Sequence, residues 1–248
     1  MAPLSDPASL AAITLVLLLG ATVKGALGVG MPLVSIPLLS LLVTPPVAIG
    51  LLAAPILVSN AMQLREARGH GLVVRRIAWL MAFQYFSLFL TVRWTSTISV
   101  VELNQWMALS VLLASCMLIF KPKFKIDPAY EPPLNVLVGL MAGFMGGVSA
   151  LTGPVVIAYL VALRMGREEF IGTISAVYLL SAAPMYVLML IYGRFGWSEI
   201  LLSVLALAPM FFGLAVGRRL RQYLNENAFR YLLLIFLLAT SVSLYLKK

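Results

Sequence analysis

Long apolar blocks separated by short polar or basic stretches make up almost the whole chain. A helix needs about 20 apolar residues to cross a bilayer. Six blocks meet this requirement: 46–64, 74–92, 103–120, 168–191, 197–216 and 228–246. Two more, 8–42 and 134–164, are longer than 30 residues and carry Gly and Pro near the middle. Each is too long for one straight span and barely long enough for two. We expect a long broken helix, a pair of short spans or a re-entrant hairpin in each.

The two broken blocks resemble each other. A shift of 122 residues, without gaps, pairs Gly25 with Gly147, Pro32 with Pro154, Gly50 with Gly172, Ser59 with Ser181, and Gly71 with Gly193. Matches of Gly, Pro and Ser at a single offset indicate an internal duplication, with halves 1–125 and 126–248. The Pro-rich and charged stretch 121–133 is the expected linker.

Basic residues at the block ends distinguish two topologies. If each broken block crosses once, the chain has eight spans and parallel halves, and the basic residues divide 10 to 6 between the two sides. If each broken block returns to its starting side, they divide 12 to 4 and the halves are inverted. The positive-inside rule favours the second topology. It predicts cytoplasmic loops at Arg65–Arg76, Lys121–Lys125 and Arg218–Arg221, in a multi-pass protein of the cell membrane.

The predicted fold class is therefore an all-α polytopic membrane protein made of two homologous halves, related as inverted repeats. Each half has one Gly/Pro-broken first segment and three full transmembrane helices. Composition agrees, because 62% of residues are hydrophobic, 11% are charged and the mean hydropathy is +1.01. A soluble domain has about 45–50% apolar residues.

Composition also limits the chemistry. The net charge of +9 lies at block ends, as orientation signals do, so a nucleic-acid partner is not expected. The single cysteine, Cys116, allows no disulfide framework and no Cys-based metal site. His70 is the only histidine, the acidic residues lie mostly at block edges, and no paired carboxylates are expected within the membrane. We expect no catalytic residues, no metal and no cofactor.

The stretch Gly20–Pro32, GATVKGALGVGMP, carries the candidate chemistry. Its four glycines and one proline interrupt an apolar block, at a helix cost of about 1 kcal/mol per glycine and about 3 kcal/mol for proline. A new helix near Met31 would leave N–H groups unpaired at its positive end. Lys24 is the only basic residue deep within a block, away from the block ends. A broken helix beside a buried cation is typical of an anion site in a membrane protein.

The equivalent stretch in the second half, Gly146–Pro154 (GGVSALTGP), offers the same break together with two hydroxyls. In inverted halves, two helix N-termini would converge on one anion from opposite sides. The predicted substrate-binding residues are Lys24, Gly25, Gly28, Gly30, Met31, Asn60, Ser149, Ala150, Thr152 and Gly153.

Structural alternatives exist for these residues. Glycines in membrane helices often let two backbones approach closely. Lys24 could extend to the membrane interface instead of facing a substrate, although a lysine at the bilayer centre costs at least about 2.5 kcal/mol. Asn60 could donate to an anion or bridge two helices. Ser175 and Tyr178 are weaker candidates in the matching second-half block.

The motif GALGVGMPLVSIPLL and its repetition at GGVSALTGPVVIAYL resemble the TauE/SafE family of sulfite exporters. The family usually has Gly-Gly before the next apolar run, whereas this chain has Gly28-Val29-Gly30-Met31-Pro32. The resemblance extends over essentially the whole chain. It implies a bacterial inner-membrane secondary carrier of sulfite, thiosulfate, sulfoacetate or other organosulfonates, driven by an ion gradient.

The expected function is alternating access around one central anion site. A coupling ion, H⁺ or Na⁺, is an expected partner beside the anion and the lipid bilayer. Three coupling routes are possible: titration of Lys24, a proton carried on the substrate, or another ion. A channel-like anion pore is the alternative function. An intramembrane enzyme or assembly factor, with the breaks serving only as packing devices, is a third.

Overall fold

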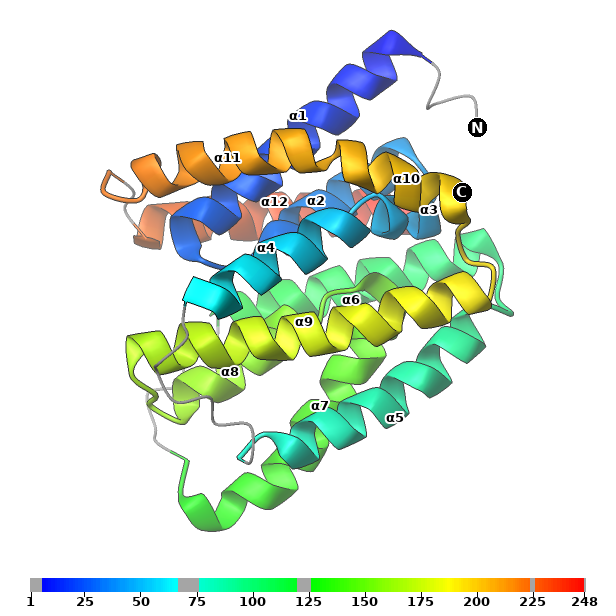
Figure 1. The fold of residues 1–248 in the computed structure, drawn as a ribbon. Helices are drawn as coiled ribbons and strands as arrows, with labels where there is room; N and C mark the ends of the chain where they lie inside the picture. Colours follow the sequence, from blue (N-terminus) through cyan, green and yellow to red (C-terminus); the bar gives the residue numbers. More distant parts are fainter. Residues whose placement is uncertain (1–5, 67–75, 120–125, 224–225, 248) are drawn as a thin grey trace.

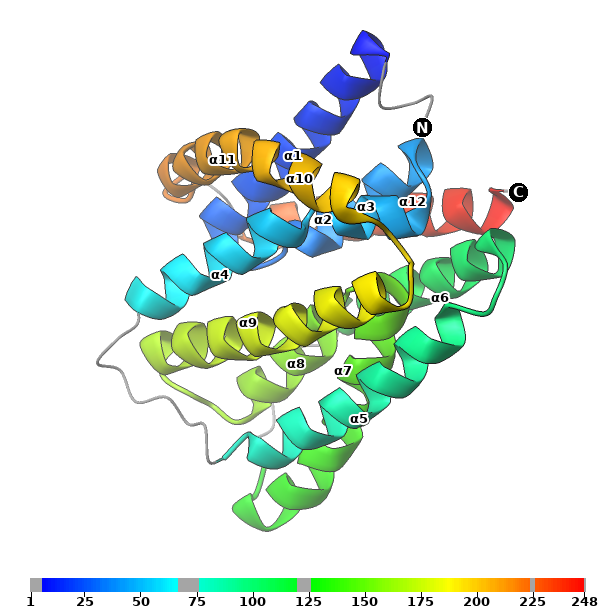
Figure 2. The same cartoon turned by 45° about the vertical axis from the view of Figure 1, so that its right-hand side comes forward.

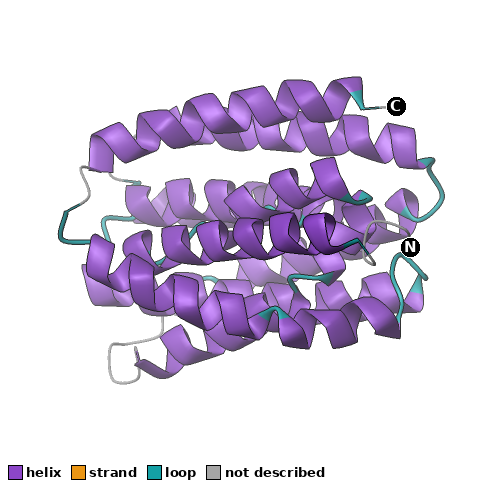
Figure 3. Cartoon of the chain, turned by 90° about the horizontal axis from the view of Figure 1, so that it is seen from above, coloured by secondary structure: helices purple, strands orange, loops and turns teal. Residues whose placement is uncertain are grey.

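The computed structural model describes residues 6–66, 76–119, 126–223 and 226–247, and every regular element within these ranges is helical (Figures 1 and 3). The elements are α1 (Pro7–Leu27), α2 (Met31–Leu42), α3 (Pro45–Gly50), α4 (Ala53–Glu66), α5 (Ala78–Thr95), α6 (Val100–Ile119), the 3₁₀ turn η2 (Pro128–Tyr130), α7 (Glu131–Ser149), α8 (Gly153–Ala162), α9 (Arg167–Ile191), α10 (Trp197–Leu205), α11 (Leu207–Leu220) and α12 (Glu226–Leu246). Five helical stretches in these ranges are long and apolar enough to cross a membrane, or six with α10 and α11 as one bent span. The all-α membrane fold class is confirmed.

Both long apolar blocks break where the glycines and prolines predict. α1 gives way to α2 at residues 28–30, and α7 gives way to α8 at residues 150–152. Pro32 and Pro154 lie in the first two positions of the new helices, where the missing N–H of proline loses no hydrogen bond. α1 and α7 are each long enough to cross a membrane, whereas α2 and α8 are short. Each block is thus a long helix followed by a short one that contacts it.

One predicted span is not straight. The pattern over 197–216 predicts a single helix, but the chain bends by 42° between α10 and α11. The cause is Pro209, whose ring would clash with the carbonyl of Leu205 four residues earlier in a continuous helix. The prediction of a continuous helix was wrong here, because one internal proline outweighs the apolar pattern.

Pro184 shows the opposite outcome inside α9, which continues past it. A proline there removes the hydrogen bond to the carbonyl of Leu180. The Tyr85 hydroxyl of α5 donates to this carbonyl over 3.2 Å. A neighbouring helix thus replaces the hydrogen bond that the proline removes.

Helices from one predicted half pack against helices from the other. The most extensive helix contacts join α5 to α7 and α1 to α11, followed by α6 with α12 and α4 with α9 (Figures 1 and 2). In the 122-residue register, α1 corresponds to α7, and α10–α11 corresponds to α5. The two largest contacts are therefore equivalents of each other, as a duplication predicts. The halves 1–125 and 126–248, and their inverted relation, stay predictions.

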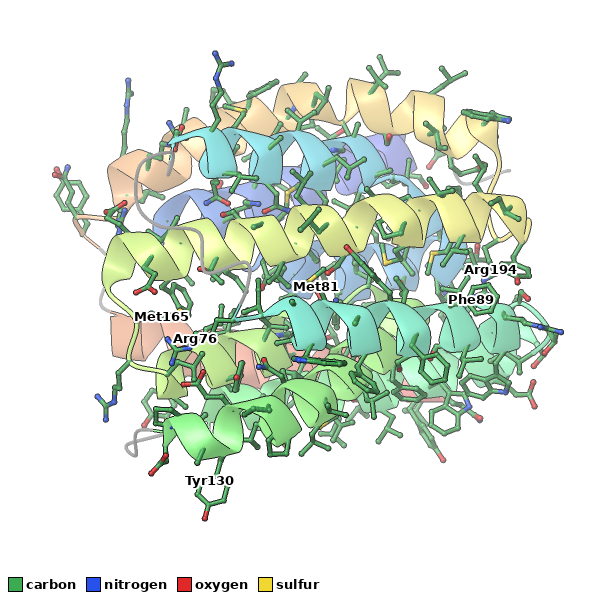
Figure 4. All side chains as sticks on the ribbon, turned by 60° about the horizontal axis from the view of Figure 1, so that its bottom comes forward. Arg76, Met81, Phe89, Tyr130, Met165 and Arg194 are labelled. Carbon is green, nitrogen blue, oxygen red and sulfur yellow. The ribbon has the colours of Figure 1, made fainter. Side chains whose placement is uncertain are left out.

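Arginines lie at both ends of the bundle, with Arg76 and Arg194 at opposite ends (Figure 4). Arg76 Nε donates to Glu131 Oε2 over 2.6 Å, and this hydrogen bond raises the pKa of Arg76 above its ordinary value. Arg194 donates to the carbonyl of Thr95. The assignment of one end to the cytoplasm stays a prediction. Residues 67–75 and 120–125, which include His70 and most of two predicted cytoplasmic loops, lie outside the described residues.

Candidate functional site at the first helix break

The first helix break has two residues in the left-handed backbone region. Gly28 follows α1 with φ 83° and donates its N–H to the Lys24 carbonyl over 2.7 Å. Gly30 precedes α2 with φ 102°. A residue with a Cβ is strained by roughly 1–2 kcal/mol in this region, so two closely spaced glycines permit the turn. α1 thus ends one turn after Lys24.

Lys24 is enclosed by protein although it carries an ammonium group. Only 3% of its surface is exposed, and Nζ donates to Oδ1 of Asn60 over 2.5 Å. Asn60, in α4, is 1% exposed. An ammonium has three N–H groups, and Asn60 accepts one of them. The amide is neutral, so it orients the ammonium without cancelling its charge.

A second side-chain amide of α4 forms a hydrogen bond to the backbone of the break. Gln63 Nε2 donates to the carbonyl of Gly28 over 2.7 Å. Residues three apart lie on the same face of a helix, so Asn60 and Gln63 both face the end of α1. The sequence analysis did not include Gln63 among the site residues. Its spacing from Asn60 is the signal that could have identified it.

A cavity of about 390 Å³ opens beside this break. Its walls come from α1, α4, α9 and α11, and its lining residues are Lys24, Gly25, Gly28, Ser59, Met62, Gln63, Glu66, Glu168, Ile171, Leu214, Arg218 and Arg221. Lys24 is the buried cation of this group, whereas Glu168, Arg218 and Arg221 are exposed. The cavity therefore connects a buried ammonium with a charged surface.

The charged surface at the mouth of the cavity contains an ion pair. Arg218 Nη2 lies 3.0 Å from Oε1 of Glu66, and more than half of each side chain is exposed. Exposed pairs of this kind stabilise a fold by only about 0–1 kcal/mol. Counted formally, the lining has three cations and two carboxylates. The excess of one positive charge is the charge of Lys24, which has no carboxylate partner among the described residues.

The second helix break is built differently. Ala150 takes the left-handed conformation with φ 55° and donates its N–H to the Gly146 carbonyl over 2.9 Å. Ser149 Oγ lies 2.9 Å from the carbonyl of Met145, to which it donates, and 2.7 Å from Oγ of Ser110. Its hydroxyl is therefore already engaged within the protein.

The start of α8 is closely packed. A Cβ on Gly153 would clash with the Tyr178 hydroxyl of α9. Thr152 is buried and none of the second-break residues lines the cavity. The structure therefore brings three predicted residues, Lys24, Gly25 and Gly28, into one cavity wall, with Asn60 behind Lys24. Gly30 and Met31 begin α2 outside the lining. A single site shared by both breaks stays a prediction.

Four charged lining residues, Glu66, Glu168, Arg218 and Arg221, were not predicted as site residues. They lie at the polar ends of apolar blocks, where charge is expected on topological grounds alone. No local sequence pattern distinguishes these cavity residues from other charged residues at block ends. Among the described residues, no three His, Cys, Asp or Glu side chains lie close enough together to hold a metal ion.

The model of the family described as "Sulfite exporter TauE/SafE" matches residues 13–244, nearly the whole chain. The chain belongs to the TauE/SafE family. No curated protein and no solved structure gives a significant match. TauE/SafE proteins are membrane transporters, and the apolar helices agree with a multi-pass membrane protein.

Proposed function

We propose that this TauE/SafE protein is a secondary carrier of small sulfur-containing anions, such as sulfite, thiosulfate or an organosulfonate like sulfoacetate. It works by alternating access, with a coupling ion that is H⁺ or Na⁺. The observation that supports this is the burial of Lys24, which is 3% exposed, at a helix break and on a cavity wall. Holding an ammonium within a membrane helix costs at least about 2.5 kcal/mol, so a ligand that needs its charge accounts for it.

The site has the donors that a sulfur oxyanion requires. After the hydrogen bond to Asn60, two N–H groups of Lys24 are left for anionic oxygens. Sulfite and sulfonate groups each present three oxygens that share a negative charge. Hydrogen bonds between charged partners contribute about 1.5–3 kcal/mol. In this proposal Asn60 positions Lys24 by bridging α4 to α1, the second of its two predicted roles, and the anion binds to Lys24.

The size of the cavity permits more than a bare oxyanion. A volume of about 390 Å³ lies within the range of small-molecule pockets, about 300–1,000 Å³. A two-carbon organosulfonate fits with several waters around it. The exposed charges at the mouth are accessible to its second end. We extend the proposal to the second break, with Ser149, Ala150, Thr152 and Gly153 contributing when the carrier changes conformation.

The test is anion binding to the purified protein by isothermal titration calorimetry. The panel is sulfite, thiosulfate, sulfoacetate, sulfate and chloride, and the variant is Lys24→Ala. The Kd for the sulfur oxyanions should rise by about ten- to a hundredfold, because one charge-assisted interaction of about 1.5–3 kcal/mol is lost. Lys24→Arg keeps the charge and should retain part of the affinity.

Arg219→Ala is the matched control, because Arg219 is exposed on α11 next to Arg218 but does not line the cavity. It should bind like the unaltered protein. Unchanged binding in Lys24→Ala would refute the assignment of this site. Proteoliposomes then separate a carrier from a channel, since a carrier shows saturable flux and counterflow, and a pore shows neither.

A further inference from the structure

The helices of this protein form two bundles that differ from the predicted halves. Bundle A contains α1–α4 and α10–α12, and bundle B contains α5–α9 (Figures 1 and 2). The largest contact of each bundle joins helices from different halves: α1 with α11 in bundle A, and α5 with α7 in bundle B. Bundle B is continuous in sequence. The chain passes between bundles only after α4 and after α9.

Hydrogen bonds between helices connect the members of each bundle. In bundle A, α4 bonds to the end of α1 through Asn60 and Gln63. Lys247, which follows α12, donates to the carbonyl of Ser40 in α2 over 2.6 Å. In bundle B, Gln84 of α5 donates to Ser181 of α9 over 2.7 Å. Ser87 of α5 donates to the carbonyl of Leu140 in α7, also over 2.7 Å.

Close glycine contacts follow the same division. In bundle A, a Cβ on Gly213 of α11 would lie 2.6 Å from the carbonyl oxygen of Leu18 in α1. In bundle B, a Cβ on Gly147 of α7 would lie 2.7 Å from Cβ of Thr91 in α5. Such close backbone packing is a main source of attraction between helices in lipid. Each bundle is therefore held together internally by close backbone packing.

The two most extensive contacts between bundles differ from each other. Along α6 and α12, Ser241 donates to the carbonyl of Ala108 over 2.8 Å, and Asn104 donates to that of Lys247 over 3.4 Å. Between α4 and α9, the described residues form no hydrogen bond and no ion pair. The cavity opens at this second contact, with Met62 of α4 and Ile171 of α9 in its wall.

From these contacts we infer that bundles A and B are the two moving bodies of the carrier. They separate between α4 and α9 and stay joined along α6 and α12. This inference rests on the proposed carrier function and goes beyond it. In lipid, helices are held together by packing and hydrogen bonds. The contact between α4 and α9 has no hydrogen bonds to break among the described residues, so its opening costs the least free energy. Each repeat half thus contributes helices to both bodies.

The experiment measures distances between spin labels in nanodiscs, in a Cys116→Ser background that removes the one exposed cysteine. The labels are attached through thioethers, because sulfite and thiosulfate cleave disulfides. The pair Arg65→Cys with Gly166→Cys reports across α4 and α9. The pair Arg65→Cys with Arg219→Cys lies within bundle A, and Trp79→Cys with Gly166→Cys within bundle B. The four positions are exposed, and a Cβ on Gly166 meets nothing within 4 Å.

Without ligand, the 65–166 distance distribution should be broad or bimodal, and the two pairs within a bundle should each give one narrow peak. Sulfoacetate should shift only the 65–166 distribution. Equal widths in all three pairs, with and without sulfoacetate, would overturn the inference, as would a change in the 65–219 distance. Calorimetry on the same labelled protein reports anion binding separately. The ligand-free distributions therefore decide on the moving bodies even if no anion binds and the proposed function fails.

Discussion

The two helix breaks occupy equivalent positions in the sequence register but differ in the residues that form them. The first break has glycine at both left-handed positions and lies on a cavity that contains the Lys24 ammonium. The second has an alanine in the left-handed region and a serine hydroxyl that is already bonded, and it lies on no described cavity wall. Equal backbone breaks thus acquire different chemistry from the residues around them. The first break holds a lysine without a carboxylate partner among the described residues, and the second holds a serine hydroxyl bonded within the protein.

The largest expected effect comes from Asn60→Asp, which removes the uncompensated charge that distinguishes the first break from the second. The carboxylate has nearly the same shape as the amide but would neutralise Lys24 directly. We expect the Kd for sulfite and sulfoacetate to rise by about a hundredfold, since each 1.4 kcal/mol is tenfold and charged hydrogen bonds contribute about 1.5–3 kcal/mol. Calorimetry beside Asn60→Ala, which leaves the charge, is the comparison. Tighter anion binding in Asn60→Asp would contradict the proposed role of Lys24.

Gly28→Ala tests the backbone of the first break. A Cβ at φ 83° should cost about 1–2 kcal/mol and lower the melting temperature in detergent. Space does not limit the substitution, because the nearest atom to the new Cβ would be Gln63 Nε2 at 3.8 Å. The loss would therefore be a backbone effect. An unchanged melting temperature would show that the chain turns equally well without glycine.

Thr152→Val tests whether the second break takes part in anion binding. Valine keeps the shape of threonine but removes the hydroxyl. If this break takes part in anion binding, as proposed, the Kd should rise by about two- to tenfold, because a neutral hydrogen bond contributes about 0.5–1.5 kcal/mol. Equal affinity in the variant and the unaltered protein would restrict the site to the first break.

The smallest effect is expected for Ala150→Gly, the reverse of the first-break substitution. Glycine should relieve left-handed strain of about 1–2 kcal/mol and lose burial of one methyl group, about 0.8 kcal/mol. The melting temperature should stay nearly the same or rise slightly. A clear drop would mean that the methyl group of Ala150 matters more for packing than its backbone strain does.

Local features of the fold were predictable from the sequence. The helix breaks near Met31 and Gly153 follow from glycine and proline, whose backbone preferences are local properties of these residues. The same physics explains the bend before Pro209, although the apolar pattern over 197–216 conceals it. Lys24 was identified because a cation in an apolar block is costly in any membrane fold.

The sequence by itself determined that this chain is an all-helical membrane protein with two broken helices and a lysine before the first break. Only the tertiary structure decided that Asn60 and Gln63 face that break and that Glu168 and Arg218 reach the same cavity. It also decided which helices pack across the predicted halves. The physical reason is how far apart in the sequence the residues lie that determine each feature. Helix breaks depend on neighbouring residues, whereas a cavity depends on which distant surfaces fit closely enough to exclude lipid and which do not.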